Sequence, residues 1–172
     1  MPQINVTEHI AAPPAVVWAF ISDLHRVPEW VIGTKKMLSV STAETEQGTE
    51  YRELSQVGFL TSETTWRVMT FRAPHVQMHE CRSAMGNVTL TMTVEPAGNG
   101  TRIRHVTEYR LMPHVRPLGR LLEALLHRRT ADDMHRSVQQ AKQIIEQEYG
   151  AVERTTPQPL QVDRAVPDHS LP

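Results

Sequence analysis

The sequence predicts an α+β fold in which a curved antiparallel sheet wraps around a long C-terminal helix. Three observations predict it: strand-type alternation over residues 4–10, a region rich in β-branched and aromatic residues over 36–111, and a helical pattern that begins at Pro117. Helices placed at the two ends of one antiparallel sheet are typical of this class. The 172 residues suit one domain that is large enough to enclose a core.

The first strand is followed by two short helices. Residues 4–10 alternate between apolar and polar side chains, as a half-buried strand does, and the pattern ends at Pro13 and Pro14. A second short helical segment surrounds Pro28, because proline is tolerated in the first turn of a helix. The apolar face of the first helix is formed by residues at helical spacing, namely Val17, Phe20, Ile21 and Leu24.

Six further strands follow, separated by short segments rich in glycine, proline and asparagine. Such connections are typical of hairpin turns, so neighbouring strands are expected to pair antiparallel. The expected strands lie near 36–43, 49–57, 62–72, 76–84, 88–95 and 101–111. With the first strand they make a seven-stranded sheet, which must curl around the one dominant helix.

The long helix is expected to run from Pro117 to about Tyr149, with Gly150 as its C-terminal stop. Residues 151–172 carry four prolines and no hydrophobic periodicity, a composition that cannot bury enough surface to offset the entropy of ordering. We therefore expect a folded domain over 1–149 and a disordered proline-rich tail over 150–172.

The long helix has two apolar faces that point in opposite directions. One is formed by Leu118, Leu121, Leu122 and Leu125, and the other by Met134, Val138, Ala141 and Ile145. Either the helix breaks near 127–130, where Thr130 resembles an N-cap, or the leucines meet something other than the sheet. The candidates are loops over the mouth of the fold, a second subunit or a membrane surface.

Composition excludes several classes of function. The formal net charge is −1 and the basic residues are scattered, so the sequence lacks the basic stripe that nucleic-acid binding requires. The lone Cys81 has no disulfide partner, and the chain has neither a leader pattern nor an apolar run of spanning length. We expect a cytoplasmic monomer or homodimer, for which peripheral membrane contact stays open.

Several short motifs occur in an order that resembles a known superfamily. They are Ile10-Ala11-Ala12-Pro13-Pro14 with Val17-Trp18, Asp23 with Pro28-Glu29-Trp30, Val68-x-x-Phe71-x-x-Pro74, Gly100-Thr101-Arg102-Ile103, and Leu118-Gly119-Arg120-Leu121-Leu122. Across residues 3–149 the chain resembles the START/Bet v 1-like (SRPBCC) superfamily, and within it the bacterial polyketide cyclase/dehydratase-like proteins. The resemblance implies a helix-grip fold whose cavity binds lipids, polyketides, isoprenoids or other apolar molecules.

Alternation along the strands predicts which side chains face the concave side of the sheet. Several inward faces carry polar groups among apolar ones, including Glu8, and buried charge is costly unless it is paired or reaches a wet cavity. The predicted ligand-binding residues are Trp30, Tyr51, Glu53, Trp66, Met78, Glu80, Arg82, Met92, His105 and Tyr109. The alternative is a register error of one residue, or an exposed strand end that carries Glu80 and Arg82.

No catalytic residue is implied by the resemblance. His105 is the one plausible general acid or base, tuned by Glu80 or Glu53. His75 and His79 are separated by a turn and a strand, so we expect no metal site and no cofactor. The leading hypothesis is a non-catalytic carrier or sensor of an apolar small molecule. The alternatives are a polyketide cyclase/dehydratase and a protein-interaction module that uses the surface at 118–126.

Overall fold

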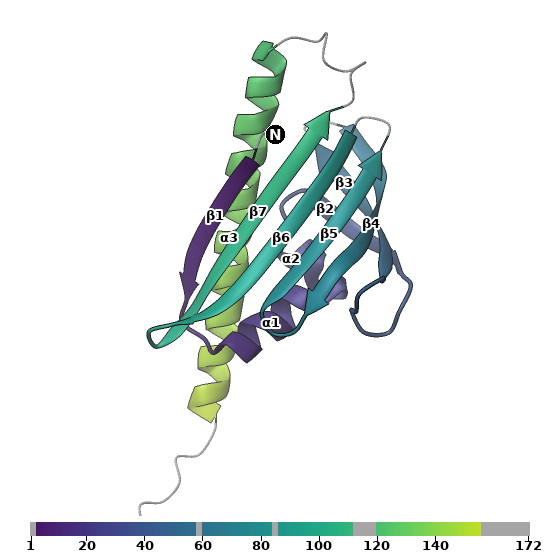
Figure 1. Ribbon diagram of the computed structural model, residues 1–172. Helices are drawn as coiled ribbons and strands as arrows, with labels where there is room; N and C mark the ends of the chain where they lie inside the picture. The colour runs from purple at the N-terminus through teal and green to yellow at the C-terminus, as the bar shows by residue number, and fades with distance from the viewer. Residues whose placement is uncertain (1–2, 58–59, 84–85, 112–119, 156–172) are drawn as a thin grey trace, which may run out of the picture.

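The computed structural model describes residues 3–57, 60–83, 86–111 and 120–155 (Figure 1). Its elements are β1 (Gln3–Ile10), α1 (Pro14–Ser22), the 3-10 turn η1 (Leu24–Arg26), α2 (Val27–Trp30), β2 (Thr34–Val40), β3 (Glu50–Val57), β4 (Leu60–Arg72), β5 (Val76–Ser83), β6 (Gly86–Ala97), β7 (Gly100–Leu111) and α3 (Arg120–Thr155). The expected order of one strand, two short helices, six strands and a long helix is confirmed.

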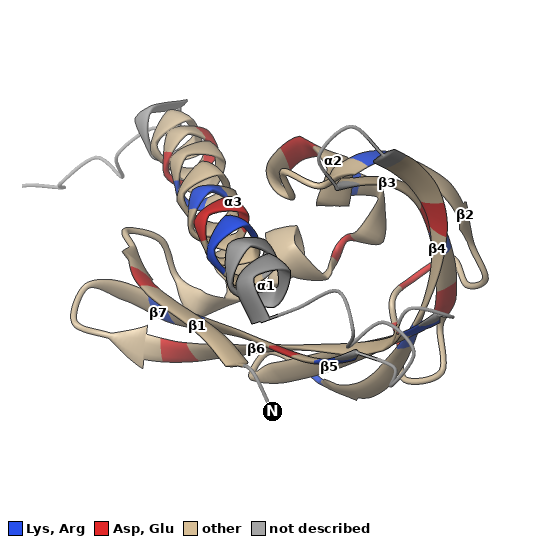
Figure 2. Ribbon diagram, turned by 90° about the horizontal axis from the view of Figure 1, so that it is seen from above, with Lys and Arg blue, Asp and Glu red and all other residues tan. Residues whose placement is uncertain are grey.

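The strands form one seven-stranded sheet with the order β1-β7-β6-β5-β4-β3-β2. Every neighbouring pair of strands is antiparallel, and β1 forms one edge of the sheet, where it pairs with β7. Figure 2 shows the sheet curving around α3, with α1 and α2 on the same concave side. The helix-grip architecture is therefore confirmed.

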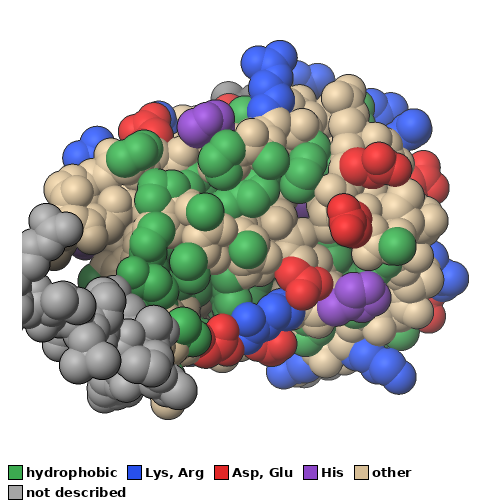
Figure 3. Space-filling model, turned by 90° about the horizontal axis from the view of Figure 1, so that it is seen from below, with side chains coloured by type: hydrophobic (Ala, Val, Ile, Leu, Met, Phe, Trp, Pro, Cys, Tyr) green, Lys and Arg blue, Asp and Glu red, His purple; other side chains and the backbone are tan. Residues whose placement is uncertain are grey.

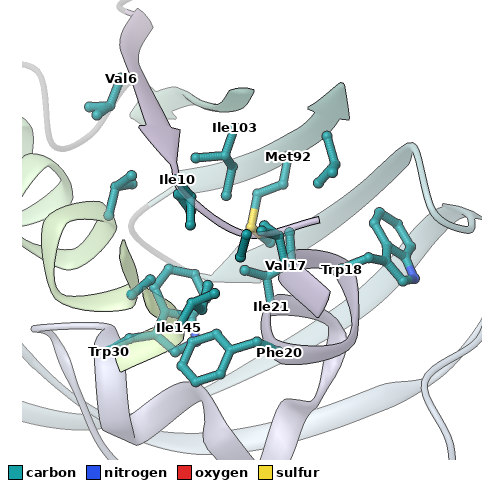
Figure 4. Close-up of a cluster of buried hydrophobic side chains, with 14 of the residues drawn as sticks. Val6, Ile10, Val17, Trp18, Phe20, Ile21, Trp30, Met92, Ile103 and Ile145 are labelled. Atoms are coloured by element: carbon teal, nitrogen blue, oxygen red, sulfur yellow. The ribbon is translucent and has the colours of Figure 1, made fainter. Parts of the chain in front are cut away.

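The main hydrophobic core lies between the sheet and the C-terminal half of α3 (Figure 4). Strands β1, β6 and β7 contribute Ile10, Val94 and Ile103, each at most 1% exposed. The helix contributes the second apolar face expected from the sequence, Met134, Val138, Ala141 and Ile145. The sheet thus grips the half of α3 that was predicted to face it.

The long helix differs from the sequence prediction at two places. It runs without interruption from Arg120 to Thr155, which excludes the first of the two alternatives, a break near 127–130. The Asp133 carboxylate bonds within the helix to Arg136, three residues later. Nor does Gly150 end the helix, which continues for a further turn. The leucine side chains at 118–126 and the tail over 156–172 lie outside the residues described.

The short helices are fastened to α3 by polar contacts. Arg26 in η1 binds Glu148 of α3 at 2.6 Å and Glu29 of α2 at 2.7 Å. The backbone N–H of Ile32 donates to the Ser137 hydroxyl, 2.9 Å away. Among the residues described, no helix is long and apolar enough to cross a membrane. The contacts to α3 hold α2 in a fixed position over the concave face of the sheet.

Replacing Gly100 or Gly150 with alanine is expected to change stability in opposite directions. A Cβ added at Gly100 would collide with the backbone oxygen of Ile10 on β1, whereas a Cβ at Gly150 would meet no atom within 4 Å. We expect Gly100→Ala to lower the free energy of unfolding by about 1–3 kcal/mol, as overpacking does. Gly150→Ala should raise it by about 0.5–1 kcal/mol, because alanine is the better helix former. Urea denaturation measures both changes, and equal effects at the two positions would contradict the β1–β7 contact.

Candidate functional site

The predicted concave face is confirmed for β6 and β7. Their register pairs Val88 with Tyr109, Leu90 with Thr107, Met92 with His105 and Val94 with Ile103. Alternation along each strand therefore places these paired residues on one face, as predicted. On β1, Val6 lies opposite His105 and is buried with it. His105 therefore lies on the concave face, between Val6 of β1 and Met92 of β6.

The predicted face of β5 is wrong. The buried residues of this strand are Gln77, His79 and Cys81, and they face inward. The set Met78, Glu80 and Arg82 consequently points to the convex side, where Glu80 and Arg82 form an ion pair at 2.8 Å. This pair lowers the pKa of the Glu80 carboxyl. None of these three side chains shares a face with His105, so Glu80 cannot tune that imidazole.

His79 is the site residue that the sequence reasoning missed. Its Nδ1 lies 2.8 Å from the Tyr51 hydroxyl, and its Nε2 lies 3.3 Å from Oε1 of Gln77. Because the Gln77 amide donates to the backbone oxygen of Ile21, its oxygen is left to accept from His79. His79 therefore carries its proton on Nε2 and accepts from Tyr51. Burial lowers its pKa to about 4, so the ring is neutral at pH 7.

Glu53 is a buried carboxylate held by neutral donors. Its oxygens accept from the Thr34 hydroxyl at 2.9 Å, the Ser55 hydroxyl at 2.8 Å and the Trp66 indole at 3.0 Å. Trp66 in turn stacks on Tyr51, with ring centroids 6.3 Å apart. In the part of the chain that the structure describes, no lysine or arginine pairs with this carboxylate. Glu53 thereby joins β2, β3 and β4 at one edge of the concave face.

His105 and Trp30 carry buried nitrogens without partners. His105 is 6% exposed and Trp30 is 2% exposed. Neither ring nitrogen of His105, nor Nε1 of Trp30, has a hydrogen-bond partner among the residues described. The two rings meet edge to face, with centroids 6.4 Å apart. Burial lowers the pKa of His105 to about 4, so this ring is also neutral at pH 7.

Burial changes along the concave face of β6. Val94 and Met92 are buried in the core, whereas Leu90 and Val88 on the same face are only partly buried. Across the sheet, Trp66 on β4 and Tyr109 on β7 are also partly buried. Beyond Met92 the apolar side chains of β6 are therefore only partly buried, although Thr107 and His79, which lie beside Leu90 on the same face, stay buried. At this end the Tyr109 hydroxyl lies 2.6 Å from Nδ1 of His127 on α3.

The structure therefore separates the predicted site residues into two groups. Those on or facing the concave side are Trp30, Tyr51, Glu53, Trp66, Met92, His105 and Tyr109. Met78, Glu80 and Arg82 lie on the opposite side. Cys81 faces inward, and burial raises the pKa of its thiol, which makes it a poor nucleophile. Within the described ranges, no three histidine, cysteine or acidic side chains gather as metal ligands would.

The molecule also has an exposed apolar surface away from this face. Figure 3 shows hydrophobic side chains gathered on the end of the molecule seen from below. Val16 of α1 is among the exposed large hydrophobic residues, at 36%. Acidic and basic side chains lie around this apolar surface in the same view.

A family model described as "Polyketide cyclase / dehydrase and lipid transport" matches residues 1–146. No curated protein matches the sequence. Similar solved structures include TTHA0849 from Thermus thermophilus, with 16% identity, a TM-score of 0.65, and coverage of 90% of this chain and 100% of that one. A START superfamily protein from Mycobacterium smegmatis has 12% identity and a TM-score of 0.64, with coverage of 87% and 98%.

A third similar structure is the di-domain ARO/CYC StfQ from the steffimycin biosynthetic pathway. It has 12% identity and a TM-score of 0.71, and the match covers 87% of this chain and 52% of that one. At these identities the structural comparisons show a shared fold.

Proposed function

Because its sequence matches that family over residues 1–146, the chain belongs to the polyketide cyclase/dehydrase and lipid transport family, and we propose that it binds an apolar small molecule. The molecule would lie between the concave face of the sheet and α3. The protein would act as a carrier or sensor and release the molecule unchanged. The proposed ligand class is a lipid, a polyketide or an isoprenoid-like compound.

The main support for this proposal is the decrease in burial along the concave face of β6. Leu90 and Val88 are only partly buried, whereas Met92 and Val94 on the same face of the strand are fully buried. Apolar side chains that could gain about 1.5–3 kcal/mol each from full burial thus lie next to a small number of polar groups. Sites for small molecules combine apolar walls with few polar anchors in this way.

The polar groups on the concave face favour an apolar ligand over a charged one. Both histidines there are neutral at pH 7, and Glu53 is already occupied by its own donors. The cytoplasm remains our proposed location, which the free, buried Cys81 supports because thiols persist in a reducing compartment.

Anthracene, a rigid apolar probe, tests the proposal through quenching of tryptophan fluorescence. The wild-type protein should bind it saturably with one-to-one stoichiometry. Leu90→Phe adds bulk on the concave face and should weaken binding by about tenfold, because overpacking a confined site costs about 1–3 kcal/mol. Thr91→Phe is the control, since Thr91 lies on the same strand and faces the other way.

Two outcomes of this titration would contradict the proposal. One is the absence of saturable binding to the wild type. The other is an equal loss of affinity in the two variants, which would place the probe elsewhere. Solvent extraction of the purified protein followed by mass spectrometry adds a second readout, in which an apolar compound should be recovered chemically unchanged.

A polyketide cyclase/dehydratase activity is the second candidate, favoured by the neutral imidazole of His105 on the concave face. Ring closure of a polyketide requires a base that removes a proton next to a carbonyl, and a neutral imidazole can do so. Glu80 is no longer a partner for it. His105→Ala should then abolish turnover of a polyketide substrate, and unchanged turnover would exclude this mechanism.

A further inference from the structure

We infer that the bound molecule carries an uncharged oxygen, either a hydroxyl or a carbonyl, which hydrogen-bonds to both Trp30 Nε1 and His105. This inference rests on the proposed function, because it assigns a polar subsite within the proposed ligand space. It names the part of the ligand that the protein distinguishes from a plain hydrocarbon.

The unpartnered nitrogens are the first observation. Buried polar groups in folded proteins are nearly always hydrogen-bonded, and leaving one unsatisfied costs about 1–3 kcal/mol. Trp30 Nε1 and both nitrogens of His105 are buried without a partner among the residues described. The two rings that carry these atoms meet edge to face, with centroids 6.4 Å apart, so one small polar group of a ligand could reach both rings.

His79 supplies the contrast on the same face. It is as deeply buried as His105, yet both of its nitrogens are bonded, one to Tyr51 and the other to Gln77. The chain therefore satisfies a buried imidazole where the role is structural. Among the residues described, no side chain hydrogen-bonds to His105, although Thr107 and Met92 are close along the sheet. A partner from outside the chain fits this difference.

The two rings come from separate elements that are held in place. His105 is in the middle of β7, flanked by β1 and β6. Trp30 ends α2, and the following segment is fixed to α3 by the bond from Ile32 N–H to Ser137. An incoming oxygen thus meets groups that are already positioned, which reduces the entropy lost on binding.

The donor and acceptor pattern determines the class of partner. The indole of Trp30 can only donate, whereas a neutral imidazole offers one N–H donor and one acceptor. A carbonyl oxygen accepts from both rings, and a hydroxyl accepts from Trp30 and donates to His105. A carboxylate or an ammonium group would be buried here without a counter-ion, at a large desolvation cost. The chemistry therefore favours a neutral oxygen.

Anthraquinone and anthracene test the inference, because they share a ring skeleton and only the quinone accepts hydrogen bonds. We expect Trp30→Phe and His105→Leu each to weaken anthraquinone binding by about tenfold and to change anthracene binding by less than about twofold. Trp18→Phe is the control, because Trp18 is a buried indole that packs on Phe71 and not on His105. This variant should affect the two probes equally.

Each other outcome has a distinct meaning. If the two site variants weaken both probes alike, the rings shape the pocket without recognising an oxygen, and the inference is overturned. If they affect neither probe, a bound water satisfies the nitrogens in the complex, and the inference fails too. If the wild type binds neither probe, the proposed function itself is contradicted. Circular dichroism and thermal unfolding confirm that each variant is folded.

Discussion

Replacing Ile145 with alanine is expected to lower the free energy of unfolding by about 3 kcal/mol, within the range seen for buried isoleucines. Ile145 lies on α3, is 1% exposed and packs in the core formed with β1, β6 and β7. The change removes three carbon atoms from the interface through which the sheet grips the helix. Strands β6 and β7 are paired on both sides and have little freedom to close the space.

Gln143→Ala provides the matched control, because Gln143 lies on the same helix and is exposed. Its effect should stay within about 0.5 kcal/mol, as for most surface substitutions. Urea denaturation followed by far-UV circular dichroism measures both variants. A loss at Ile145 no larger than that at Gln143 would mean that the second half of α3 is not held by the sheet.

Lowering the pH from 7 to 5 is expected to cost about 2 kcal/mol of stability for each of the two buried histidines. His79 and His105 have pKa values of about 4 in the folded protein, against 6.5 for a free imidazole, because burial disfavours the charged ring. Between these values the unfolded chain binds more protons than the folded one. The free energy of unfolding therefore falls as the pH falls through this window, and the loss levels off only below the folded pKa of about 4.

Stability measured by urea denaturation at a series of pH values tests this expectation. His105→Leu removes one titrating group and should remove about half of the loss between pH 7 and pH 5. His75→Gln, at an exposed position in the turn after β4, is the matched histidine substitution and should retain the loss caused by the two buried rings. A flat profile for the wild type would show that neither histidine is buried in its neutral form.

Hydrophobic alternation predicted the face of a strand wherever the buried side chains are apolar. On β6, Met92 and Val94 alternate with threonines, and pairing with β7 then places Ile103 and His105 on the same side. The polar His105 was therefore placed correctly by its neighbours. The number of strands and their antiparallel pairing were predicted from the turn residues between the strands.

On β5 the same reasoning gave the wrong face because the buried residues are polar. Gln77 and His79 are buried through hydrogen bonds to Ile21 and Tyr51, whereas the apolar Val76 and Met78 are turned the other way. Partners that come from α1 and β3 cannot be read from the sequence of β5 alone. When distant residues hydrogen-bond to the inward polar side chains of a strand, hydrophobic alternation indicates the wrong face of that strand. For this reason the sequence analysis missed His79.

The long helix shows a different limit of sequence reasoning. Thr130 and the acidic residues after it have the pattern of a helix start, yet the chain is helical on both sides of them. Asp133 bonds to Arg136 along the helix surface, so these side chains support an existing helix. One local capping pattern does not end a helix whose residues on both sides are helical, since extending an existing helix costs less free energy than nucleating a new one.

Intermolecular contacts measured by NMR between bound anthraquinone and methyl-labelled protein show directly whether an apolar molecule binds on the concave face. Both faces of the sheet carry suitable methyl groups. We expect contacts from the probe to the concave residues Val88, Leu90 and Met92, and none to the exposed Met69 and Leu38. Contacts to Met69 or Leu38 in place of the concave residues would contradict binding on the concave face.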